Sequence, residues 1–342
     1  MRGKSGSRPA RERGMTLIEL MISMTIGLVV LALTSYAYLA NKRSWMFNEQ
    51  DARLQDRGRY ILNMLTGDIR LAGYMGCKSI ASSAPVPSLP NIPKLDALLV
   101  NGVGITNGAG SAKTTTELNL FGPIPGGNFQ LTTKLAKDGT SATTAAITPD
   151  QSSDSAWGST AHVSFVLIDD CGSAQFVEAT PTAAGVINMS AGAKANAEYA
   201  AGTTVNWYDW SSANGQGGTV YTYANNELRR NGQLLANNVE LFRVCIGVDT
   251  DKDNKIDETR FANWDATALH GNEIPLTIHV NLVLASPPGQ RVQDQAVQPT
   301  YSVCGPNGSG YWQPSGTSDD SAHAYRLRRL FSTSVTLRNR VR

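Results

Sequence analysis

Residues 249–258 hold the most concentrated group of acidic side chains in the chain. The candidate metal ligands there, at loop positions 1, 3, 5, 7 and 9, are Asp249, Asp251, Asp253, Lys255 (through its backbone carbonyl) and Asp257. When such a loop curls, these oxygens converge on one point, and Ca2+ prefers about six to eight oxygen ligands. Arg260 stands at position 12, where an EF-hand has a glutamate, so a shorter nine-position loop fits better. We expect a calcium site; the alternative is a polar hairpin turn with solvated acids.

The four cysteines are a second set of residues that could take part in chemistry: Cys77, Cys171, Cys245 and Cys304. None belongs to a C-x-x-C motif, so we do not expect zinc binding or redox catalysis. All four follow a long apolar segment near the N-terminus, and they are expected on its far side, in the oxidising periplasm. Two disulfides are therefore expected. Four cysteines allow three connectivities, of which we favour Cys77–Cys171 and Cys245–Cys304.

Catalytic motifs are not evident in the sequence. The histidines are scattered, and there is no Gly-x-Ser-x-Gly, His-Glu-x-x-His or phosphate-binding loop. His279 stands on the polar face of an expected strand, which favours a surface role. We do not expect an enzyme.

Basic charge is unevenly distributed along the 342 residues, which carry 30 Lys and Arg against 28 Asp and Glu. Residues 1–14 contain five of the basic residues and one acidic residue, so the remainder is slightly acidic. We therefore interpret the C-terminal arginines as a solvated strand face and tail, and we do not expect nucleic acid as a partner. These arginines are Arg326, Arg328, Arg329, Arg338, Arg340 and Arg342.

Residues 15–40 form an apolar run with a single charge, Glu19. A helix of roughly 20 apolar residues crosses a bilayer, and the basic block before it keeps the N-terminus cytoplasmic. A cleaved secretory signal has a shorter apolar region without charge. A plain membrane anchor gives no reason for Glu19, because a charge in a membrane helix is costly.

The stretch Gly14–Leu20, GMTLIEL, resembles the prepilin signature of type IV pilins and type II secretion pseudopilins. The resemblance implies that residues 1–14 are a leader removed by a prepilin peptidase and that Met15 becomes a methylated N-terminus. It also implies that Glu19 acts in assembly. Many major pilins have a helix-bending proline in the apolar segment. This chain has none between Pro9 and Pro85, which suits a minor pilin.

The resemblance also implies a role for the charge on Glu19. In a fibre the apolar segments pack together, and a buried carboxylate needs a positive partner. The N-terminal amine of a neighbouring subunit can supply that partner. Such a pair would fix the axial register between subunits.

Beyond residue 40 the sequence still predicts helix. An apolar stripe with helical spacing continues through Leu54, Ile61, Leu65, Ile69 and Ala72, and Gly73 is a suitable C-cap. We expect one helix from Met15 to about Ala72, transmembrane over 15–40 and amphipathic over 41–75. Gly58 and Gly67 are expected to weaken it by about 1 kcal/mol each relative to Ala.

The remaining residues, 76–342, are expected to form a periplasmic β-rich head. Residues 101–116 and 136–160 are rich in Gly, Ser, Thr and Ala and are predicted to be long surface loops, with a short β-like piece at Glu117–Phe121. From residue 162 onward strands predominate. The expected strands are His162–Ile168, Thr219–Tyr223, Val239–Ile246, Thr277–Leu284 and about Arg326–Val341.

Two later segments, Glu227–Leu241 and Arg329–Val335, are similar to PilW-type minor pilins and the related large pseudopilins. The resemblance implies an α+β, pilin-like fold. In that fold a long N-terminal helix, transmembrane in its first half, packs on an antiparallel β-sheet head with long loops.

Three functions remain open from the sequence. The first is a PilW-like minor pilin that primes a type IV pilus and lies near its tip; the second is a pseudopilin of type II secretion. The third is a membrane-anchored adhesin. The partners implied for the first are other minor pilins, the major pilin, the prepilin peptidase, the inner-membrane assembly platform and a PilY-type tip adhesin. The chain would reside in the bacterial inner membrane, in contact with lipid, and then in the pilus fibre.

Overall fold

The structure is a computed structural model that describes residues 16–74, 76–77, 102–106, 116–123, 127–144, 162–181, 186–189, 194–211, 216–260, 273–288, 300–304, 310–313 and 326–337. By the density of its contacts the chain divides into two units, Met1–Asp51 and Ala52–Arg342. The first unit holds the apolar part of the long helix. The second holds the rest of that helix and the β-rich head.

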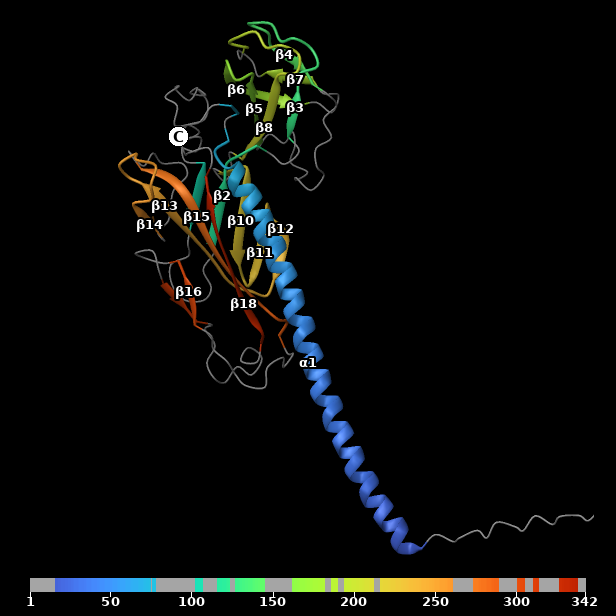
Figure 1. Cartoon of the computed structure of the whole chain (residues 1–342). Helices are drawn as coiled ribbons and strands as arrows, with labels where there is room; N and C mark the ends of the chain where they lie inside the picture. The colour runs from blue at the N-terminus through green and yellow to red at the C-terminus, as the bar shows by residue number, and fades with distance from the viewer. Residues whose placement is uncertain are drawn as a thin grey trace, which may run out of the picture. The chain divides into compact units, whose positions relative to one another are not determined.

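Helix α1 runs from Leu17 to Leu71 (Figure 1), close to the expected bounds. Its last turn ends at Gly73, which has φ +67° and donates its amide to the carbonyl of Phe121 over 2.7 Å. This left-handed conformation favours glycine and confirms the predicted C-cap. In the second unit one stripe of residues along α1 is buried: Leu54, Gly58, Ile61, Leu65 and Ile69.

A five-stranded antiparallel sheet lies beside the second half of α1 (Figure 1). Its order is β1 (Val103–Thr106), β2 (Thr116–Leu120), β10 (Thr219–Ala224), β11 (Glu227–Arg230) and β12 (Gln233–Asn237). Two-residue turns join its last three strands. Asn225 and Asn226 have positive φ, as do Asn231 and Gly232, which suits the primed turns of tight hairpins.

A four-stranded antiparallel sheet contains the longest strands. Its order is β14 (Glu258–Arg260), β13 (Val239–Asp249), β15 (Ile274–Ala285) and β18 (Arg328–Thr336). Strands β13 and β15 are buried along almost their whole length, so side chains on both faces of this sheet are covered. A hairpin of β16 (Tyr301–Val303) and β17 (Gly310–Trp312) packs against Leu241 and Val283 of this sheet.

The third sheet forms a separate inserted lobe, residues 127–217. Its order is β3 (Asn128–Gln130), β8 (Thr204–Ser211), β5 (His162–Asp169), β6 (Ala174–Pro181), β7 (Val186–Met189) and β4 (Ser141–Thr143), and β9 (Gln216–Gly217) pairs with β8. The lobe has its own hydrophobic core, which includes Val166, Tyr199 and Trp207. It lies between β2 and β10 in the sequence, yet these two strands are neighbours, with Leu120 opposite Thr219.

The α+β architecture of one long helix and an antiparallel β-rich head is confirmed. The expected strands correspond to β5, β10, β13 and β15, and β2 matches the short β-like piece. The last strand is shorter than expected and ends at Thr336. The prediction of loops over 101–116 and 136–160 was wrong in part, because β1 and β4 lie there. Strand β1 pairs with β2, and β4 pairs with β7. This pairing stabilises the two short strands, and it cannot be deduced from their composition.

Candidate functional site

The start of α1 holds the predicted assembly residue, Glu19. Thr16 precedes the helix, and its hydroxyl lies 3.4 Å from the amide nitrogen of Glu19 and 3.5 Å from its carboxylate. Thr16 is therefore an N-cap, because its hydroxyl accepts the Glu19 amide, which the helix leaves unpaired, and donates to the Glu19 carboxylate. The spacing was visible in the sequence but its capping role was not predicted. Gly14 and Met15, the predicted cleavage and methylation residues, lie outside the described residues.

The apolar half of α1 is uncovered within the chain. Its large apolar side chains between Leu17 and Leu39 are each more than half exposed. Among the described residues, α1 is the one helix long and apolar enough to cross a membrane, and none of its most apolar stretch is buried. Exposed apolar surface of this extent is unfavourable in water, so this half needs a lipid or protein environment.

A polar cluster attaches the second half of α1 to the five-stranded sheet. Arg230 of β11 donates two hydrogen bonds to the carboxylate of Asp68, over 2.8 and 3.2 Å. The Tyr221 hydroxyl of β10 donates to the same carboxylate. Burial and the nearby Asp68 charge raise the pKa of Tyr221 well above its ordinary value. These bonds fix the helix relative to β10 and β11, because a buried carboxylate is costly without such partners.

Gly58 has a packing role that the sequence did not reveal. The ring of Phe331, on β18, lies directly against it, and a Cβ atom at position 58 would overlap the ring carbons. This packing contact comes in addition to the expected effect of Gly58 on helix propensity. Gly67 differs, because nothing lies within 4 Å of a Cβ placed there.

The acidic loop between β13 and β14 brings three of its predicted ligands together. Carboxylate oxygens of Asp249, Asp251 and Asp257 all lie within 4.8 Å of one another. Asp249 is fully buried and accepts hydrogen bonds from the backbone amides of the loop, including those of Lys252 and Asn254. Both of these residues have positive φ, so the chain curls tightly around Asp249.

The fourth predicted carboxylate points elsewhere. Asp253 accepts a hydrogen bond from the side chain of Lys255 over 2.6 Å, and this bond holds the pKa of Asp253 below its ordinary value. Hydrogen bonds from the backbone and hydroxyl of Thr250 lower the pKa of Asp257 in the same way. The loop thus brings one carboxylate oxygen from each of Asp249, Asp251 and Asp257 to one point. That donor set fits a hard cation such as Ca2+, with fewer protein ligands than the full predicted set.

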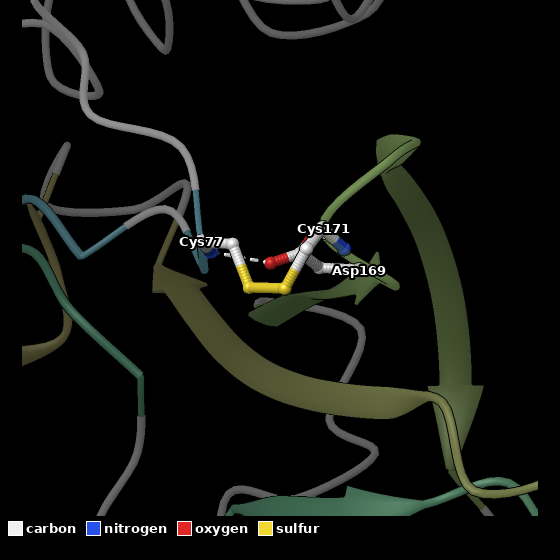
Figure 2. Close-up of side chains that lie close together, drawn as sticks. All are labelled: Cys77, Asp169 and Cys171. Carbon is white, nitrogen blue, oxygen red and sulfur yellow. Dashed lines mark hydrogen bonds between the residues drawn. A yellow bond between two sulfur atoms is a disulfide. The ribbon is translucent and has the colours of Figure 1, made fainter.

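Two disulfides join the expected cysteine pairs. Cys245 of β13 is bonded to Cys304, which follows β16, and both are buried. Cys77, just after α1, is bonded to Cys171 in the turn between β5 and β6 (Figure 2). The second bond ties the inserted lobe to the segment that follows the helix.

Two C-terminal arginines have a structural role. The guanidinium groups of Arg326 and Arg328 pair with the carboxylate of Glu240 at 3.2 and 2.6 Å, and both arginine side chains are less than 5% exposed. Burial lowers the pKa of Arg326. The interpretation of these two as solvated is wrong, since a sequence cannot show which strand face a neighbouring segment covers. Arg329 is exposed, and Arg338, Arg340 and Arg342 lie outside the described residues.

Comparisons with known proteins support a pilin-like classification. Residues 9–35 match the prokaryotic N-terminal methylation motif. Over 83 residues the chain is 36% identical to the pilin-like protein PilA3 of Thermus thermophilus. This match covers 23% of the chain and about a third, 35%, of the length of that relative. No solved structure matches the chain.

Proposed function

We propose that the chain is a PilW-like minor pilin that helps to prime assembly of a type IV pilus and lies at or near its tip. The observation that carries the proposal is the N-terminal methylation motif on an apolar helix that the chain leaves uncovered. Before assembly the bilayer covers this helix half. In the fibre the apolar halves of other subunits cover it.

Glu19 is the residue that would align the subunit. Its carboxylate is exposed at the start of an apolar helix, where it accepts a hydrogen bond from the Thr16 hydroxyl. Inside a fibre this carboxylate would be desolvated, and the N-terminal amine of a neighbouring subunit would neutralise it. A subunit displaced along the axis would lose that pair.

The proposal is tested in a deletion strain complemented with variants. Deletion should reduce surface piliation and twitching, and Glu19→Ala should restore membrane insertion without restoring pili. Thr16→Ala is the matched control, because it removes the hydroxyl that bonds to Glu19 and keeps the charge of Glu19. Normal piliation with Glu19→Ala, or equal loss with Thr16→Ala, would contradict the register role.

Blocking leader cleavage distinguishes a filament subunit from an anchored adhesin. A bulky residue in place of Gly14 should block leader cleavage and abolish function. Loss of protein export with intact pili in the deletion strain would instead indicate a type II secretion pseudopilin. An adhesin without a filament role would retain its function when Gly14 is replaced.

We further propose that the acidic loop binds Ca2+ through Asp249, Asp251 and Asp257. Calcium should raise the melting temperature of the full chain in detergent, because a ligand bound only to the folded state stabilises it. Asp251→Asn should abolish the shift, whereas Glu258→Gln, which neutralises a neighbouring acid outside the set, should keep it. No shift at millimolar calcium would remove this proposal.

A further inference from the structure

The two disulfides differ in their access to solvent. Cys77 and Cys171 are exposed, whereas Cys245 is fully buried and Cys304 is 8% exposed. Thiol–disulfide exchange requires an attacking thiolate to reach a sulfur atom. Of the two bonds, Cys77–Cys171 is therefore the one open to an external thiol.

A buried carboxylate lies beside this exposed disulfide (Figure 2). Asp169, at the end of β5, is 4% exposed. One of its oxygens accepts the backbone amide of Cys77 over 2.5 Å, and the other accepts the amide of Cys171 over 2.9 Å. The carboxylate thus holds the backbone on both sides of the disulfide.

The close contact between Asp169 and the segment before Cys77 requires glycine at position 76. Gly76 has φ +70°, and a Cβ there would overlap a carboxylate oxygen of Asp169. Glycine therefore permits the close approach that directs the Cys77 amide to Asp169. Cys171 also has positive φ, at 66°, which fixes the opposite side of the disulfide.

The disulfide links two parts that otherwise touch through weaker contacts. The Tyr208 hydroxyl of the inserted lobe donates to the carbonyl of Tyr74, just after α1, over 2.6 Å. The Tyr208 ring stacks on Phe121, which follows β2, with centroids 5.4 Å apart. Opening the disulfide would leave non-covalent contacts such as these, and the hydrogen bond from the Cys77 amide to Asp169, to hold the two parts together.

We propose that Cys77–Cys171 is a thiol–disulfide exchange site for a dithiol oxidoreductase, and that Asp169 is the positioning residue that favours its closed form. In the opening step a thiolate of the partner attacks one cystine sulfur and breaks the S–S bond. The second partner thiol then resolves the mixed disulfide. Two electrons and two protons pass to Cys77 and Cys171, and the partner leaves as a disulfide; closure is the reverse.

Asp169 and the disulfide support each other. While the bond is closed, the Cys77 amide remains beside the carboxylate and satisfies it. When the bond opens and this segment moves away, Asp169 loses a charge-assisted hydrogen bond inside the protein. Removing Asp169 should therefore make Cys77–Cys171 easier to reduce, without effect on Cys245–Cys304.

The wild-type chain gives the first test. The full chain in detergent is equilibrated with reduced and oxidised dithiothreitol, its thiols are trapped, and each cysteine is quantified by peptide mass spectrometry. Cys77 and Cys171 should become reduced first, with the native fold retained, and hydrogen exchange should increase at residues 74–77 and 169–172 only. Reduction of both disulfides together, or of Cys245–Cys304 first, would overturn the proposal.

Matched variants give the second test. Asp169→Asn should shift the equilibrium of Cys77–Cys171 toward the thiols by about tenfold, the factor for one hydrogen bond to a charged group. Asp170→Asn neutralises the adjacent acid, whose carboxylate accepts the amides of Gly172 and Ser173 in its own turn, and should leave the equilibrium unchanged. An equal shift in both variants, or in neither, would exclude positioning by Asp169. If Asp169→Asn prevents folding, the wild-type exchange order alone decides whether the site exists.

Discussion

Gly58 and Gly67 of α1 show how two identical residues on one helix can have opposite effects. Gly58 is covered by the ring of Phe331, and Gly67 has open space around it. We expect Gly67→Ala to stabilise the chain by about 1 kcal/mol, through helix propensity. Gly58→Ala should destabilise it by about 1–3 kcal/mol, because the added methyl group overpacks the contact. Urea unfolding in detergent measures both.

Each of these variants is the control for the other, because both make the same change in the same helix. Stabilisation by both would show that the Phe331 ring moves aside without loss. Destabilisation by both would show that Gly67 has a packing partner in the folded chain.

His279 should make stability depend on pH. It lies half-buried on β15 between Thr277 and Ser334, and burial lowers its pKa below the ordinary value near 6.5. Below about pH 6.5 the unfolded chain therefore binds a proton that the folded chain resists, so stability falls as the pH decreases. His279→Gln should remove this part of the pH dependence.

The free energy of unfolding is measured between pH 5 and 8 for the wild type and for His279→Gln, and the difference between the two is followed with pH. Above about pH 7 the difference should be constant, because the imidazole is then neutral in both states. A difference that stays constant down to pH 5 would contradict the lowered pKa.

At the residue scale, the sequence predicted what depends on local pattern. Gly73 as a C-cap and Glu19 at the helix start were expected on this ground. The two cysteine pairs, 94 and 59 residues apart, were instead favoured among three possible connectivities. The sequence did not predict other contacts made by distant residues, such as Phe331 against Gly58 or Glu240 against Arg326. The same holds for Asp253, whose pairing with Lys255 depends on the path of the loop.

At the scale of elements, the inserted lobe should be separable from the rest of the head. Strands β2 and β10 are already neighbours, so a two-residue turn can replace residues 123–217 without moving either strand. With Cys77→Ser to avoid a free thiol, this variant should still form Cys245–Cys304 and keep the four-stranded sheet. The disulfide is measured by mass spectrometry and the sheet by hydrogen exchange.

Loss of protection in β13, β15 and β18 in that variant would show that the lobe is required for the rest of the head to fold. Cys77→Ser alone is the control, because it separates loss of the disulfide from loss of the lobe.

The lobe itself could not be predicted from the sequence. Its strands β3 and β4 have three residues each, with one apolar residue in the middle, and their pairing partners lie far away in the sequence. Alternation of apolar residues did predict β5, although Phe165–Ile168 are all buried and Val166 and Ile168, on the opposite face to the predicted one, lie in the core of the lobe. Periodicity finds strands long enough to show a pattern, and it gives no information on which strands pair.

At the scale of the molecule, the apolar half of α1 should determine how the chain behaves in water. Removing residues 1–40 should yield a chain that remains in the aqueous phase in detergent partitioning. A chain lacking only residues 1–14 should enter the detergent phase, because it keeps the exposed apolar side chains. Entry of the shorter chain into detergent would show a second apolar surface on the remaining residues.

The overall α+β architecture was implied by the resemblance to pilins, and the pattern of the sequence on a long scale agrees with it. An apolar run, an amphipathic continuation and a strand-rich remainder leave few arrangements that bury the apolar stripe. The division of the described part of the head into separate sheets could not be predicted, because it depends on how distant segments compete for partners.

The insertion of the lobe between β2 and β10 also bears on the order in which the chain folds. In the extended chain, Leu120 and Thr219 are separated by the whole lobe, and joining them directly would close a long, entropically costly loop. Once the lobe has folded on its own core, its ends lie close together and that loop is effectively short. The five-stranded sheet is therefore expected to form late, after the hairpins β10–β11 and β11–β12, whose local pairings do not depend on the lobe.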